Sequence, residues 1–377
     1  MTNNKKKKIP WGQYMFLVLS TMITAAFGYF ISIYFFESIG AEDRTIVETL
    51  LLSILLLLYI YAAIFLQLAI HEAGHLIFGL LTGFSFLSYR IGSFMWVKEN
   101  EKLKIKRMSI AGTGGQCLMN PPENPGEKPP FILFNLGGSI TNIVCGLLFF
   151  GLFFLFKNMV YFSGFLLFLG VFGIFFALFN GIPMKLGMVN NDGYNALSLG
   201  KNPEALRSFY TQLKVVGKAS EGTRIKDMPE EWFFRAEVKD SISLTMDVFG
   251  SSRLMDMHRF VEADQLMSEL LETDYLAGLH RHLLTSERMY CELIGENRKD
   301  VLESLADKKQ RKFMKSMRKN PSILRTEYGY ALLAEKDSAK AVKIMTEFEK
   351  VARTYPVKSE IESEREFIDI INSITVR

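Results

Sequence analysis

The chain has 377 residues, enough for a membrane domain and a soluble one, and its formal net charge is only +4. This small charge and the lack of a basic patch with interleaved aromatic residues exclude a typical nucleic-acid-binding protein. The three cysteines, at 117, 145 and 291, are scattered, so they indicate neither a disulfide framework nor a C-x-x-C metal site.

Charged residues are distributed unevenly along the chain. Residues 1–200 carry 14 Lys and Arg and 10 Asp and Glu, whereas residues 201–377 carry 30 of each kind. The first part contains long apolar runs, and the second has the composition of a soluble globular domain. We therefore expect a transmembrane domain at 1–200 and a cytoplasmic helical domain at 201–377.

Two apolar runs open the membrane domain. The lysines at 5–8 precede an apolar run at 11–36 that is long enough to cross a bilayer, and they predict a cytoplasmic amino terminus. We expect this helix to be retained; the alternative is a cleaved signal peptide. The second run, at 46–81, exceeds one perpendicular span, which predicts a tilted or protruding helix.

The second run contains His71, Glu72 and His75 near its end, in the pattern H-E-x-x-H. Histidines four residues apart lie on one face of a helix, so both imidazoles can reach one zinc ion. The glutamate can then accept a proton from a water that zinc activates. Gln67, one turn earlier, is interpreted either as a support for the ligands or as a polar residue facing the bundle.

A polar connection at 82–130 follows, with 7 Lys and Arg against 4 acids, as expected for a cytoplasmic loop. Residues 84–97 and the alternating Lys102–Lys106 predict a β-hairpin whose turn lies at 99–101. The lysines either protect an exposed edge from aggregation or border an edge that accepts an extended substrate. The glycine- and proline-rich remainder predicts an irregular loop.

The third and fourth apolar runs, at 131–156 and 159–179, return the chain to the cytoplasmic side. The third carries a polar stripe that either joins helices or contacts substrate: Asn135, Ser139 and Asn142. The fourth ends in Asn180-Gly181-Ile182-Pro183, an interruption that is tolerated where it lines a polar cavity.

Asp192 is the only acid between Lys157 and Lys201. The second and fourth runs end on the same side of the membrane, so Asp192 can lie at the depth of His71 and His75. An aspartate before glycine is often a turn former. A catalytic zinc ion takes three protein ligands, however, and this position favours Asp192 as the third.

Three segments together resemble the site-2 protease family of intramembrane zinc metalloproteases: His71-Glu72-x-x-His75, Gly138–Asn142 and Asn180–Gly193. The likeness covers about residues 45–200. The chain departs from the family pattern in having Ser139 in place of proline and a longer spacing between Pro183 and Asp192.

The resemblance implies a Zn²⁺ ion bound by His71, His75 and Asp192, with Glu72 as general base. It also implies that Asn142 and Asn180 hold the substrate backbone or the oxyanion. The expected substrate is a membrane-bound peptide or a single-span protein, cleaved near the cytoplasmic leaflet of a bacterial cell membrane.

The soluble part has helical periodicity throughout. A loose similarity at an offset of about forty residues resembles a degenerate tetratricopeptide array, which would bind a protein partner; the alternative is a compact helical cap. The histidines at 258, 280 and 282 are interpreted as ordinary surface or helix residues. Helices are predicted at 203–216, 230–250, 256–272, 275–294, 299–319, 322–334, 338–355 and 359–374.

The predicted fold is thus mainly α: a polytopic bundle of about four spans, a small cytoplasmic β-hairpin or sheet, and a soluble, tetratricopeptide-like helical domain. The expected function is intramembrane zinc-dependent endopeptidase activity. The alternative is a non-proteolytic membrane scaffold or transport accessory that binds a partner through its helical tail. Neither function involves nucleic acid.

Overall fold

A computed structural model of the chain describes residues 11–38, 45–99, 102–107, 114–122, 130–185, 190–235, 237 and 240–375. The described chain is mostly helical and packs into two units. One unit contains helices α1 to α4 and the beginning of α5; the other contains a small sheet and the later helices. The strands thus belong with the helical unit, whereas the predicted boundary at residue 200 groups them with the membrane helices and remains a prediction.

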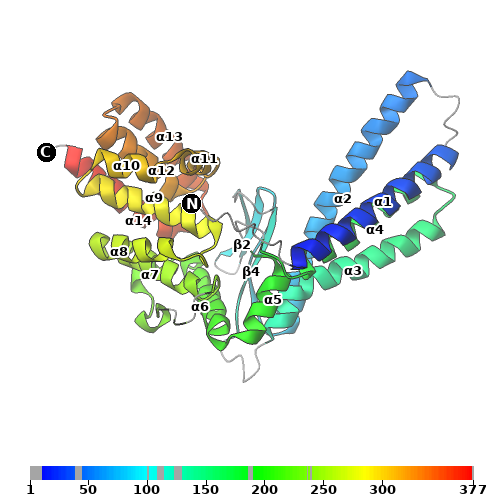
Figure 1. The fold of residues 1–377 in the computed structure, drawn as a ribbon, viewed down its shortest axis with the longest axis horizontal. Helices are drawn as coiled ribbons and strands as arrows, with labels where there is room; N and C mark the ends of the chain where they lie inside the picture. Colours follow the sequence, from blue (N-terminus) through cyan, green and yellow to red (C-terminus); the bar gives the residue numbers. More distant parts are fainter. Residues whose placement is uncertain are drawn as a thin grey trace, which may run out of the picture. The chain divides into compact units, whose positions relative to one another are not determined.

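The first unit is built from α1 (Trp11–Ser38), α2 (Ile46–Leu81), α3 (Phe131–Leu155) and α4 (Val160–Gly181). Helix α4 packs against α1 and α3, and α3 packs against α2 (Figure 1). Helices α2, α3 and α4 are long and apolar enough to cross a membrane. The apolar stretch described in α1 is shorter, so the fourth span remains a prediction.

Helix α2 has well-defined ends. Thr45 and Glu48 form a capping box, in which the Glu48 carboxylate accepts a hydrogen bond from the Thr45 backbone N–H at 2.9 Å. At the other end, Gly83 has φ +88°, a conformation that glycine adopts without strain. Thirty-six residues of helix extend over about 54 Å, more than the ~30 Å hydrocarbon core of a bilayer.

The apolar side chains of α2 are largely exposed within the unit. Leu50 and Leu58 are 58% and 59% exposed, although Tyr59 of the same half of α2 packs against Phe165 and Phe168 of α4. Exposing such an apolar surface to water is unfavourable, so this face is suited to lipid.

Glycines bring the opposite half of α2 close to α3. A Cβ atom added at Gly74 would lie only 2.4 Å from the carbonyl oxygen of Gly137. Across the next interface, a Cβ at Gly146 would lie 3.2 Å from the carbonyl oxygen of Gly170 in α4. Small residues permit this close approach of helix backbones, which sets how polar groups on the three helices meet.

The sheet has the order β3-β2-β1-β4 and is antiparallel: β1 (Ser85–Ile91), β2 (Phe94–Glu99), β3 (Lys102–Arg107) and β4 (Gly115–Asn120). The pairing of β2 with β3 confirms the predicted hairpin, and its turn lies outside the described residues. No strand was predicted at β4, which pairs with β1. Strand β3 lies at an edge of the sheet, where Leu103 and Ile105 are exposed.

The remaining helices are α5 (Asp192–Lys201), α6 (Pro203–Ser220), η1 (Ile225–Asp227), η2 (Glu230–Trp232), α7 (Leu244–Asp256), α8 (Phe260–Glu272), α9 (Gly278–Ile294), α10 (Lys299–Leu305), α11 (Lys308–Ser316), α12 (Pro321–Gly329), η3 (Tyr330–Ala334), α13 (Ser338–Thr354) and α14 (Lys358–Thr375).

Two of the predicted helices are wrong. The predicted helix at 230–250 contains only η2 and the first half of α7, with non-helical backbone before Leu244. The predicted helix at 299–319 is divided into α10 and α11, because the Asp307 side chain accepts a hydrogen bond from the Gln310 N–H and starts a new helix. Consecutive helices pack in pairs, such as α7 with α8 and α12 with α13, and the tetratricopeptide likeness remains a prediction.

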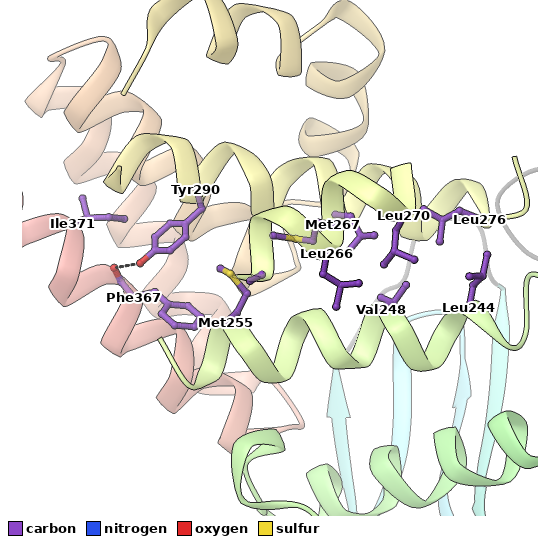
Figure 2. Close-up of a cluster of buried hydrophobic side chains, with 12 residues drawn as sticks. Leu244, Val248, Met255, Leu266, Met267, Leu270, Leu276, Tyr290, Phe367 and Ile371 are labelled. Carbon is purple, nitrogen blue, oxygen red and sulfur yellow. Dashed lines mark hydrogen bonds between the residues drawn. The ribbon is translucent and has the colours of Figure 1, made fainter. Parts of the chain in front are cut away.

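Helix α14 joins the two main hydrophobic clusters of the helical unit. Phe367 and Ile371 contribute to a cluster with α7, α8 and α9 (Figure 2), and Ile361 and Ile368 contribute to a cluster with α12 and α13. In the first cluster, the fully buried Tyr290 donates a hydrogen bond to the backbone oxygen of Phe367 at 3.1 Å (Figure 2).

Candidate metal centre

Three side chains of the first unit converge on one point: His71 and His75 from α2, and Asp192 from the start of α5. The His71 Nε2 lies 3.0 Å from the Asp192 Oδ2, and the His75 Nε2 lies 3.3 Å from that oxygen. The two Nε2 atoms are 3.2 Å apart. The structure therefore brings together the three residues that the sequence selected, and the histidines are buried.

The opposite ring nitrogens show which way each imidazole is protonated. The His71 Nδ1 lies 2.7 Å from the Asn142 Oδ1, and the His75 Nδ1 lies 2.8 Å from the Phe134 carbonyl oxygen. The Asn142 Nδ2 donates to Gln67 acceptors, so its oxygen must face His71. Each Nδ1 therefore donates, and each Nε2 presents its lone pair to the centre of the triangle.

These three electron-rich atoms fit a bound cation. Bonds of ~2.0–2.2 Å in a tetrahedral zinc site place the ligand atoms about 3.3–3.6 Å apart. The three observed separations lie between 3.0 and 3.3 Å. Two neutral imidazoles and one carboxylate suit a divalent metal, and three protein ligands leave one tetrahedral position open.

A hydrogen-bonded chain holds His71 in place. Both amide hydrogens of Asn142 are used within the helix bundle, because its Nδ2 donates to the Gln67 backbone oxygen at 3.0 Å and to the Gln67 Oε1 at 2.7 Å. The Gln67 Nε2 in turn donates to the Leu169 carbonyl oxygen of α4 at 2.7 Å. Asn142 thus keeps no donor for a substrate oxyanion, and the geometry favours a supporting role for both side chains.

Gly138 leaves room for the His71 ring. A Cβ atom added at Gly138 would lie 2.5 Å from the His71 Cε1 and 2.7 Å from both ring nitrogens. No side chain at this position is compatible with the observed imidazole. The glycine of the polar stripe on α3 is therefore part of the metal centre, because it sets the position of one ligand.

Asn191 positions the carboxylate ligand, and the sequence interpretation missed it. This buried side chain accepts hydrogen bonds from the Tyr194 N–H at 3.0 Å, which caps α5, and from the Met184 N–H at 2.9 Å. Its Nδ2 donates to the Phe179 and Ile182 carbonyl oxygens at the end of α4. An asparagine directly before a helix-starting Asp-Gly was the available signal.

The long spacing before Asp192 is accommodated locally. Lys185 and Asn190 pair as an isolated antiparallel bridge, which brings the two ends of this segment together. Gly193 then packs against the end of α4, where a Cβ would lie 2.2 Å from the Gly181 carbonyl oxygen. The extra length therefore does not displace Asp192 from the histidines.

The other predicted site residues have different surroundings. Glu72 is buried and follows His71 directly in α2, and its role as general base remains a prediction. The Asn180 Nδ2 donates at 3.1 Å to the Phe176 carbonyl oxygen within α4, and this residue remains a predicted substrate contact. Ser139 is buried, and its hydroxyl has no hydrogen-bond partner among the described residues.

The metal centre is thus formed by two ligands on one turn of α2 and one at the start of α5. Hydrogen bonds from α3, α4 and Asn191 hold these ligands in place. Compared with known proteins, the chain matches no family model, no curated protein and no solved structure.

Proposed function

We propose that the chain is a membrane-embedded, zinc-dependent endopeptidase. The observation that carries this proposal is the triangle of His71, His75 and Asp192 atoms with the buried Glu72 beside it on an apolar helix. Ionisable groups in such a helix are costly to place in a membrane and are usually retained for function.

Zinc would be held by the Nε2 atoms of His71 and His75 and by the Asp192 carboxylate. When bound, zinc polarises a scissile carbonyl group and makes water more acidic. Asn142 and the Phe134 carbonyl accept the Nδ1 protons of the two histidines, which keeps both rings in the ligating tautomer.

Glu72 is the general base of the proposed reaction. It accepts the proton of the attacking water and later donates a proton to the amine that leaves. Its burial keeps bulk solvent from competing for that proton. Residues of α3 and α4 around the centre orient the ligands and take no part in proton transfer.

The proposed substrate is a transmembrane or membrane-associated peptide segment that is locally unwound near the cytoplasmic leaflet. Unwinding is necessary because helical hydrogen bonds shield the scissile peptide bond in lipid. The described end of α4, where Pro183 interrupts the helix, offers non-helical backbone on the same unit as the metal centre. In this proposal, both termini are cytoplasmic and the helical unit binds a protein partner.

Two variants of the full-length protein, purified in detergent, test the proposal. Metal content is measured by elemental analysis, and cleavage of a panel of transmembrane peptides is followed by mass spectrometry. Wild type should contain one zinc ion per chain and cleave at least one peptide. Glu72→Gln should keep the zinc and lose cleavage, whereas Asp192→Asn should lose most of the zinc.

The control is Asp240→Asn, which changes an aspartate in the helical unit and should alter neither zinc content nor cleavage. Cleavage that persists in Glu72→Gln would reject the assigned base. Unchanged zinc in Asp192→Asn would reject the third ligand. Wild-type protein without stoichiometric zinc would favour the alternative function, a membrane scaffold.

A further inference from the structure

The helical unit contains a cavity of about 330 Å³ that is remote in sequence from the metal ligands. It is formed by α6, α7, α9, the start of α12 and α14, and most of its lining is apolar. Val248, Met255 and Phe367 line it and are also members of the hydrophobic cluster in Figure 2. Small-ligand sites measure ~300–1,000 Å³, so this cavity suits a ligand of about dipeptide size.

The polar part of the cavity wall is acidic. Four carboxylates line the cavity, those of Asp256, Glu287, Glu360 and Glu364, and no lysine or arginine does so. Arg224 pairs with Asp256 and neutralises that carboxylate. The other three carboxylates of the wall belong to Glu287, Glu360 and Glu364.

Among the described residues, Arg325 is the cation that pairs with two of these carboxylates. The fully buried Arg325 lies 2.6 Å from the Glu287 Oε2 and 2.8 Å from the Glu364 Oε2. Glu360 instead accepts a hydrogen bond from the Tyr355 hydroxyl at 2.8 Å. Burial above all, together with the charges of Glu287 and Glu360, raises the pKa of Glu364 to about 7, although Arg325 opposes this shift.

His280 also lines the cavity. Burial lowers the pKa of His280 to about 4, so the ring is neutral at neutral pH and adds no positive charge to the acidic wall.

We propose that this cavity binds the free amino-terminal end of an apolar peptide. The ammonium group lies against Glu360 and Glu364, and large side chains pack on Val248 and Phe367. It provides a cationic partner for Glu360, which forms no ion pair among the described residues and accepts a hydrogen bond from Tyr355. Asn320 and Ser322 at the cavity edge add polar groups that suit a peptide backbone. This inference does not depend on the metal centre.

The test uses full-length protein in detergent and isothermal titration calorimetry. The probes are dipeptide amides built from Leu, Ile, Val, Met, Phe and Trp, each compared with its N-acetylated form. At least one free amine should bind saturably, and acetylation should weaken that binding by about tenfold or more, because it removes the charge.

Matched variants locate the site. Glu360→Gln should weaken binding of the best amine about tenfold, whereas Glu362→Gln, an exposed glutamate of the same helix outside the cavity lining, should leave it unchanged. Ser252→Trp should block the cavity and abolish binding, with circular dichroism confirming that the helices remain.

Three results would overturn the proposal: no dipeptide amide binds, free and acetylated forms bind equally, or Glu360→Gln and Glu362→Gln behave alike. Zinc content is measured on the same samples. It should be unchanged in all three variants, which separates failure of the peptide site from failure of the metal centre.

Discussion

Replacing Asn142 by alanine tests whether this residue supports the metal ligand or contacts the substrate. The resemblance to site-2 proteases implies a substrate contact. In the structure, the Asn142 Oδ1 lies 2.7 Å from the His71 Nδ1, and the Nδ2 is bound to Gln67. Asn142→Ala therefore removes the acceptor that sets the His71 tautomer and the donor that binds the Gln67 Oε1.

The expected loss is in zinc affinity. A net contribution of ~0.5–1.5 kcal/mol for each of the hydrogen bonds to His71 and Gln67 gives about 1–3 kcal/mol. Loss of a partner behind a ligating histidine typically weakens metal binding by ~10–100-fold, which corresponds to ~1.4–2.8 kcal/mol. The two estimates agree, so we expect the zinc dissociation constant to rise by about one to two orders of magnitude.

The assay is competition for zinc between the detergent-solubilised protein and a chromophoric chelator. Asn135→Ala is the matched control, because Asn135 is a buried asparagine of the same helix whose Nδ2 donates to the Phe131 carbonyl oxygen of its own helix. It should leave zinc affinity unchanged. If Asn142→Ala also binds zinc as wild type does but loses cleavage, the supporting role is wrong and the substrate contact is right.

Two further predictions concern packing and pH. Gly138→Ala should abolish stoichiometric zinc binding, because its Cβ would lie 2.5 Å from the His71 ring, whereas Gly151→Ala, with nothing within 4 Å, should bind zinc normally; equal zinc contents would contradict this. Burial lowers the pKa of His280 from 6.5 to about 4. The folded protein therefore binds this proton less readily than the unfolded chain, so the contribution of neutral His280 to the free energy of unfolding is complete above pH 6.5 and is lost as the pH falls toward 4. Wild type should therefore lose about 3 kcal/mol more free energy of unfolding than His280→Leu between pH 7.5 and pH 4, measured by chemical denaturation, and parallel losses would refute the assignment.

Sequence patterns over short stretches of the chain predicted the membrane helices and the two histidine ligands. The apolar helices α2, α3 and α4 begin and end within a few residues of their predicted limits, because hydropathy and helix-ending prolines act over short distances. The pairing of His71 with His75 follows from helix periodicity alone. Asp192 was identified because few acids were available on the correct side of the membrane.

Features that arise from packing between distant segments escaped prediction. Strand β4 forms because it pairs with β1, and its own residues carry no strong strand pattern. The role of Asn142 depends on α2 and α3 approaching through Gly74 and Gly137. The unpaired nitrogen of His280 is a property of the surrounding helices, and nothing in its sequence neighbourhood distinguishes it from an ordinary helix residue.

The helical unit cannot finish folding until helix α14, near its carboxyl-terminal end, has been synthesised. Its Glu364 is one of two partners of the buried Arg325, and its Ser359 donates to the Ala219 carbonyl oxygen of α6, 140 residues earlier. A chain still on the ribosome holds Arg325 before Glu364 has been made, so of its two partners this buried charge then has Glu287 alone. The earlier helices therefore stay open to chaperones and proteases until translation has reached α14, so a stop codon before this helix would remove the whole unit rather than shorten it.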